Sequence, residues 1–118
     1  MSPDELKKRT RQFALRVIRL CAALPRTRVT DVIGRQLVRA GTSVGANYRA
    51  ACKARSAAEF ASRMGIVEEE ADECVYWIEL LVESGAMTQG KVGALLKEAT
   101  ELVAIAAASR KTSRRQSR

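Results

Sequence analysis

The segment from residue 60 to residue 81 constrains the fold of this chain most strongly. Its apolar residues are separated by alternating steps of four and three over three heptads, and they are Phe60, Met64, Val67, Ala71, Cys74, Ile78 and Leu81. Such a repeat places one continuous apolar stripe along an α-helix, as in bundles and coiled coils. We therefore predict a helix over residues 57–84, with a capping box of Ser56 and Glu59 at its start and Gly85 at its end.

Three other segments have helical periodicity, and strand-period alternation occurs nowhere in the sequence. They predict helices over residues 3–24, 28–53 and 89–108, the first ending near Pro25 because proline cannot continue the hydrogen-bond ladder. Short connections make consecutive helices antiparallel. The predicted fold is all-α, a single-domain antiparallel up-down four-helix bundle over residues 1–109. Residues 110–118 contain no apolar side chain and are expected to form a disordered basic tail.

The chain contains no histidine, which excludes several kinds of active site. A Ser-His-Asp triad, a Cys-His pair and a Glu-x-x-His di-iron site all require that residue. Cys21, Cys52 and Cys74 are odd in number, widely spaced and close to apolar stripes, as expected for reduced thiols rather than a metal site. We expect a protein that is not an enzyme and has no catalytic residue, no cofactor, no metal and no small-molecule substrate.

The N-terminus is polar, and no run of 18 uncharged apolar residues occurs. A membrane span and a secretion signal both need such apolar stretches. We therefore expect no membrane association and a cytoplasmic location.

Charge is distributed unevenly along the 118 residues, whose net charge is +8. Residues 1–55 hold 13 Lys/Arg against 3 Asp/Glu, a net charge of +10, whereas residues 56–109 hold 3 Lys/Arg against 10 Asp/Glu, a net charge of −7. The last nine residues add five cations. This polarity indicates a polyanionic partner, head-to-tail self-association, or both.

The helix predicted over residues 28–53 has two chemically different faces. Its cations fall within about 80° of one another on a helical projection, opposite an apolar stripe that includes Leu37 and Val44. Arginine exceeds lysine in the basic regions, which suits phosphate contact. The missing aromatic platform and zinc-finger spacing favour backbone binding with little sequence preference. The predicted nucleic-acid contacts are Arg28, Arg35, Arg39, Arg49 and Lys53, together with Arg16 and Arg19 of the first helix.

Two sets of residues predict helix contacts. Gly41 and Gly45 lack the Lys-Ser/Thr pair of a phosphate-binding loop, and instead predict the close approach of another helix, which we assign to an oligomer interface. The second set is a further apolar stripe on the third helix. Either it contacts another subunit or it widens the core face, and it consists of Ile66, Trp77 and Leu80.

Polar residues border the core stripes of the second and third helices. Paired carboxylates can serve acid-base or metal chemistry, but without histidine they make a poor transition-metal site. We predict instead a structural hydrogen-bond network that fixes the register of the two helices. Its members are Gln36, Ser43, Asn47, Glu70 and Glu73.

The blocks RQLVRAGTSVGANYRAA and IVEEEADECVYWIELL together resemble the 23S rRNA intervening-sequence proteins, over about residues 6–108. The resemblance implies an antiparallel four-helix bundle that assembles into a ring-shaped homopentamer. It also implies kinship with accessory proteins of diversity-generating retroelements, similar basic pentamers that engage nucleic acid and a reverse transcriptase. The family has no established catalytic residue to carry over.

These observations lead to two hypotheses of function. In the first, a homopentameric bundle binds RNA or DNA backbones through its basic surface, with a possible link to 23S rRNA insertions or to a reverse transcriptase. In the second, the protein is a scaffold whose subunits meet through complementary charges, without nucleic acid.

Overall fold

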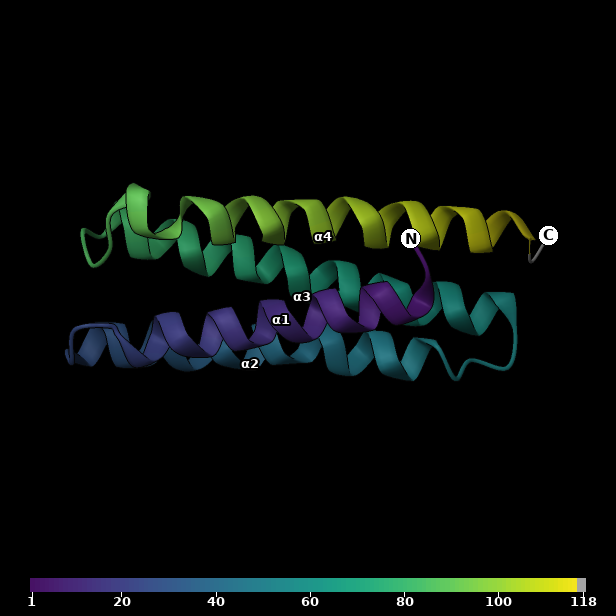
Figure 1. Ribbon diagram of the computed structural model, residues 1–118, viewed down its shortest axis with the longest axis horizontal. Helices are drawn as coiled ribbons and strands as arrows, with labels where there is room; N and C mark the ends of the chain where they lie inside the picture. The colour runs from purple at the N-terminus through teal and green to yellow at the C-terminus, as the bar shows by residue number, and fades with distance from the viewer. Residues whose placement is uncertain (117–118) are drawn as a thin grey trace.

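A computed structural model describes residues 1–116 of the chain, and it is all-α over that range. The four helices are α1 (Pro3–Ala22), α2 (Arg28–Ala51), α3 (Ala57–Glu83) and α4 (Gln89–Gln116), and no strand is present among these residues. The all-α, four-helix prediction is confirmed. All four helices lie along the long axis of a molecule that measures 48 × 22 × 19 Å (Figure 1).

Polar side chains define where the helices begin. Ser2 Oγ accepts a hydrogen bond from the Glu5 amide at 3.2 Å. The start of α2 has a reciprocal capping box, which was not predicted from the sequence. There, Thr27 Oγ1 accepts from the Thr30 amide at 3.1 Å, while Thr30 Oγ1 accepts from the Thr27 amide at 3.0 Å.

The boundaries of α3 match the prediction closely. Ser56 Oγ accepts from the Glu59 amide at 3.0 Å, but Glu59 Oε2 accepts from the Arg55 amide at 3.0 Å, one residue before the expected position. Gly85 has a φ of +83° and ends the helix in the left-handed conformation that glycine adopts without steric cost.

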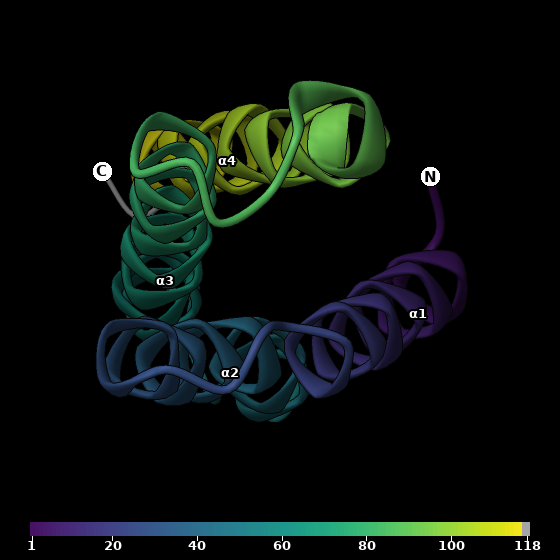
Figure 2. The same cartoon turned by 90° about the vertical axis from the view of Figure 1, so that its left-hand side faces the viewer.

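The apolar stripes form the core. In α3, every predicted stripe residue is buried except Phe60, which is half-buried against the core. Helix α3 packs against both α2 and α4, whereas α1 packs mainly against α2. Figure 2 shows this arrangement end-on, with α1 and α4 at the two ends of the series. Within residues 1–116, the side of the α1–α2 pair that is turned away from α3 and α4 therefore faces no other helix.

Helix α4 is longer than predicted, and the expected disordered tail is helical as far as Gln116. Arg110 Nε lies 2.8 Å from Glu68 Oε1 of α3, and the Ser113 hydroxyl donates to the Ala57 carbonyl at 2.7 Å. The prediction was wrong for residues 110–116 because it considered only apolar burial, and this segment docks through polar contacts. Residues 117–118 of the predicted tail lie outside the described residues.

None of the helices within residues 1–116 combines the length and apolar composition needed to cross a membrane.

Candidate nucleic-acid interface

Four cations surround a pocket between the N-terminal half of α1 and the C-terminal half of α2. Lys7, Lys8 and Arg11 come from α1, and Arg49 comes from α2. The pocket has a volume of about 530 Å³, and its other lining residues are small: Thr10, Ala14, Thr42, Gly45 and Ala46. Within residues 1–116, no carboxylate lines it and none of the four cations has an ion-pair partner. Its positive charge is therefore not neutralised by the protein.

Glycines on α2 allow α1 to lie close enough to form this pocket. A β-carbon at Gly41 would lie 2.8 Å from Val17 Cγ1, and one at Gly45 would lie 3.2 Å from Thr10 Oγ1. The predicted close approach is present, but the neighbouring helix is α1 of the same chain. The assignment of Gly41 to an oligomer interface is corrected, because this residue is buried inside the subunit. Gly45 likewise packs against α1.

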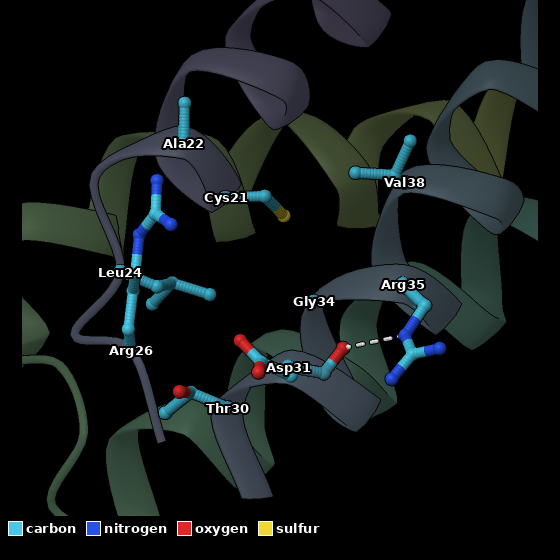
Figure 3. A pocket seen from close by; sticks show the side chains of 9 residues that line it. All are labelled: Cys21, Ala22, Leu24, Arg26, Thr30, Asp31, Gly34, Arg35 and Val38. Atoms are coloured by element: carbon cyan, nitrogen blue, oxygen red, sulfur yellow. Dashed lines mark hydrogen bonds between the residues drawn. The ribbon is translucent and has the colours of Figure 1, made fainter. Parts of the chain in front are cut away.

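A second pocket, of about 430 Å³, lies where α1 connects to α2 (Figure 3). Gly34, Val38, Thr42, Gly45 and Arg49 of α2 line one pocket or the other at steps of four, four, three and four residues. Residues at these steps share one face of a helix, so the pockets lie along one groove between α1 and α2. We call it the α1–α2 groove. The second pocket is lined by Cys21, Ala22, Leu24, Arg26, Thr30, Asp31, Gly34, Arg35 and Val38.

The one thiol in this second pocket is not poised for nucleophilic chemistry. Burial raises the pKa of Cys21 to about 11. At neutral pH the group is therefore a thiol rather than the reactive thiolate. The groove offers charge and hydrogen bonding, not a covalent mechanism.

Six of the seven predicted phosphate contacts are exposed side chains, and five of these have no ion-pair partner in the described residues. The five are Arg19, Arg28, Arg35, Arg49 and Lys53. Arg16 is half-buried, and its charge helps to lower the pKa of Glu98 on α4. Only Arg35 and Arg49 of the seven line the α1–α2 groove.

Arg39 differs from the prediction because its guanidinium group is held by carboxylates of α3. Its Nη1 lies 3.1 Å from Glu70 Oε2, its Nη2 pairs with Glu73, and its Nε donates to Gln36 Oε1 at 3.3 Å. The hydrogen bond to Glu73 is the main factor that raises the pKa of Arg39. Arg39 therefore links α2 to α3, and we remove it from the candidate interface.

The predicted polar network is divided in two. Gln36, Glu70 and Glu73 meet around Arg39. Asn47 instead donates from Nδ2 to the Ser43 carbonyl, one turn earlier in α2, at 2.8 Å. In the described residues no hydrogen bond joins Asn47 or Ser43 to the carboxylates of α3. Arg39 completes the network, but it was not predicted as a member because it was assigned to the nucleic-acid contacts.

The second apolar stripe of α3 is only partly covered. Ile66 is 36% exposed, whereas Trp77 and Leu80 are half-buried against the core. The Trp77 indole N–H is buried without a hydrogen-bond partner in the described structure, and the neighbouring Tyr76 ring packs edge-on at 5.1 Å between centroids. A subunit contact at this stripe stays a prediction.

Lys7, Lys8 and Arg11 were not among the seven predicted phosphate contacts, and the second pocket was not predicted. The α1 cations carry a detectable signal, because Lys7 and Arg11 are one helical turn apart. Their convergence with Arg49 depends on the position of α1 against Gly41 and Gly45, which the helical pattern alone does not give.

Comparison with known proteins identifies the family. A sequence model described as 23S rRNA-intervening sequence protein matches residues 4–108. The chain belongs to this family. A crystal structure described as a protein of unknown function from the S23 ribosomal protein family of Bacteroides thetaiotaomicron is 32% identical, with a TM-score of 0.83. The match covers 89% of this chain and 97% of that chain. A comparison with curated proteins found no match. The resemblance inferred from the two sequence blocks is thereby confirmed.

Proposed function

We propose that this intervening-sequence family protein is a non-enzymatic, homo-oligomeric bundle that binds nucleic-acid backbones in the α1–α2 groove. The observation that carries the proposal is the first pocket, where Lys7, Lys8, Arg11 and Arg49 surround small side chains and no acidic residue lines the pocket. Unpaired cations attract phosphates, and their contact releases the counterions that are condensed on the nucleic acid. The small residues between them let a backbone approach, and contact with phosphate and sugar carries little base specificity.

The proposal includes an antiparallel up-down bundle and a homopentamer. The first is supported by the helix connections, which lie at alternating ends of the molecule in Figure 1. The pentamer rests on the family resemblance, and it would repeat the α1–α2 groove once per subunit. Repetition strengthens attraction to a long polyanion because several weak contacts act together. A cytoplasmic location, RNA as well as DNA targets and an associated reverse transcriptase belong to the same proposal.

Binding across a salt series tests the nucleic-acid part. Labelled RNA and duplex DNA would be titrated with wild type and with a variant carrying Ala at Lys7, Lys8, Arg11 and Arg49. The expected result is strong salt dependence in wild type and a weaker dependence in the variant, by about 0.9 in the log–log slope for each duplex phosphate that is no longer neutralised. A matched variant removes two exposed arginines and two exposed lysines outside the groove, Arg55, Arg63, Lys91 and Lys97. Equal losses of affinity in both variants would reject the α1–α2 groove as the binding site, and so would weak binding of wild type at low salt.

The alternative is a scaffold assembled through complementary charges. It is favoured by the exposed acidic residues Glu69, Asp72, Glu79 and Glu83 of α3, which could meet the basic side of a neighbouring subunit. Light scattering after size exclusion, at low and high salt, separates the two functions. Dissociation of the oligomer at high salt, without nucleic-acid binding at low salt, supports the scaffold. A monomer mass at micromolar concentration rejects the pentamer.

A further inference from the structure

The second pocket of the α1–α2 groove contains an unpaired carboxylate on a basic surface. Asp31 is the only acidic residue between Glu5 and Glu59. It lines the pocket together with Arg26 and Arg35, yet no ion pair joins it to either arginine in the part of the chain that the structure describes. Arg35 Nε instead donates to the Asp31 backbone carbonyl at 3.3 Å. The pocket therefore presents both an unused anionic acceptor and unused cationic donors.

Figure 3 shows how these groups surround the opening. Arg26 and Arg35 lie on opposite sides, and the Asp31 carboxylate lies between them, directed away from the Arg35 guanidinium group. As an acid in the first turn of α2, Asp31 also interacts favourably with the helix dipole. The helix dipole explains why an acidic residue is favourable at this position, but it does not explain why the carboxylate lines a pocket.

Apart from Thr30, the rest of the lining is apolar, which suits the faces of a flat ring. Leu24, Ala22 and Val38 contribute aliphatic surface. Gly34 adds no side chain to the lining, and a β-carbon there would lie at an ordinary contact distance of 3.4 Å from Leu24 Cδ1. The volume of about 430 Å³ falls within the range of about 300 to 1,000 Å³ of small-molecule sites.

We propose that this pocket binds one unstacked guanine base of a nucleic acid whose backbone lies in the α1–α2 groove. The inference rests on the proposed function and adds a base preference to it. An ionised carboxylate only accepts hydrogen bonds, and guanine presents two adjacent donors, N1–H and the 2-amino group, that match its two oxygens. Adenine, cytosine and uracil each place an acceptor beside their donor. That acceptor would face the negative charge of Asp31.

The two arginines complete the recognition. Arginine guanidinium groups stack on unpaired bases and also bind phosphate oxygens in a bidentate manner. Arg26 and Arg35, on opposite sides of the opening, can therefore hold the base plane and the adjacent phosphate. From Arg35 the groove continues to Arg49, about 20 Å along α2, so a single strand could lie in both pockets at once.

The experiment measures fluorescence anisotropy of the full chain with three labelled ten-nucleotide RNAs. One is oligouridylate, one carries a single central guanosine, and one carries inosine at the same place. A bidentate contact discriminates between bases by about fivefold or more. We expect the guanosine strand to bind at least about fivefold more tightly than oligouridylate. Inosine, which lacks the 2-amino group, should lose most of this advantage. Equal affinity for the three strands overturns the inference.

Asp31→Asn tests the residue, and Asp4→Asn is its matched control. Both residues are exposed acids in the first turn of a helix, so each variant removes one negative charge from a first helical turn. Asp31→Asn should bring the ratio of guanosine to uridine affinity close to one. It should leave oligouridylate binding unchanged or tighter, because a negative charge has left a polyanion site. Asp4→Asn should keep the ratio. A ratio that survives in Asp31→Asn rejects the assignment.

The outcomes also separate this inference from the proposed function. If no RNA binds in a salt-dependent manner, the backbone proposal fails and the base pocket fails with it. If all three strands bind with strong salt dependence and equal affinity, the backbone proposal holds and only the guanine pocket is rejected.

Discussion

Gly41 of α2 packs more closely against its neighbour, Val17 of α1, than any other glycine of the described residues packs against its own. A β-carbon at position 41 would lie 2.8 Å from Val17 Cγ1 and 3.0 Å from Val17 Cγ2. Val17 is fully buried, so it has no solvent-filled space into which to move. The distance between α1 and α2, and with it the width of the α1–α2 groove, depends on this missing side chain.

Gly41→Ala should therefore destabilise the protein although alanine is the better helix former. Overpacking of a dense core costs about 1 to 3 kcal/mol, whereas the helix propensity of alanine returns about 1 kcal/mol. Gly93→Ala is the control, since its nearest neighbour is Gln89 Nε2 at 3.7 Å, an ordinary contact. Urea denaturation should show a lower free energy of unfolding for Gly41→Ala and an equal or higher one for Gly93→Ala. The same change in both variants would contradict the close contact.

Ser113→Ala should release the last turns of α4. The Ser113 hydroxyl is the donor to the Ala57 carbonyl at 2.7 Å, and its removal leaves that acceptor without this partner at a cost of about 1 kcal/mol. Hydrogen exchange of the amides of residues 110–116 should accelerate, while exchange in α2 stays unchanged. Thr112→Ala, at an exposed neighbouring position, is the control. Fast exchange of this segment already in wild type would argue against the docked helix.

Glu98 should make the stability of the protein depend on pH. Arg9 donates to both carboxylate oxygens of Glu98 at 2.7 Å, and this hydrogen bond lowers the pKa of Glu98. A carboxyl group with a lower pKa in the folded state stabilises the fold above its unfolded pKa of about 4.3. That contribution is lost as the pH falls through the folded pKa. The free energy of unfolding of wild type should therefore decline more steeply below about pH 5 than that of Glu98→Gln.

At neutral pH, Glu98→Gln should cost about 1 to 3 kcal/mol, because it replaces a charge-assisted hydrogen bond of a half-buried pair. Glu83→Gln provides the comparison, as Glu83 is exposed and unpaired within the described residues. Parallel pH profiles for Glu98→Gln and wild type would show that the Arg9 pair does not contribute.

The fold was predictable because it depends on local patterns. The heptad stripe from Met64 to Leu81 specifies a buried helix face, and Gly85 ends that helix by its own conformational freedom. The site was less predictable because it depends on pairing between distant residues. Arg39 lies among the cations on one face of α2, and only the position of α3 shows that Glu70 and Glu73 neutralise its charge. The pocket around Asp31 likewise forms only when the end of α1 lies over α2.

Arg39 and Arg49 should therefore respond differently to the same substitution. Arg39→Gln leaves Glu70 and Glu73 one turn apart without their shared cation, and this like-charge pair should lower the free energy of unfolding by roughly 0.5 to 1 kcal/mol. Arg49→Gln breaks no ion pair in the described chain and should leave stability unchanged.

For nucleic-acid binding we expect the reverse, with the larger effect for Arg49→Gln and the smaller one for Arg39→Gln. Arg49→Gln removes a phosphate contact and should reduce the log–log salt slope for duplex DNA by about 0.9, whereas Arg39→Gln should leave the slope near its wild-type value. Thermal unfolding and DNA titrations on the same two preparations measure both effects. A larger slope change for Arg39→Gln would mean that its guanidinium group exchanges the α3 carboxylates for phosphate. The interface would then extend from the α1–α2 groove toward α3.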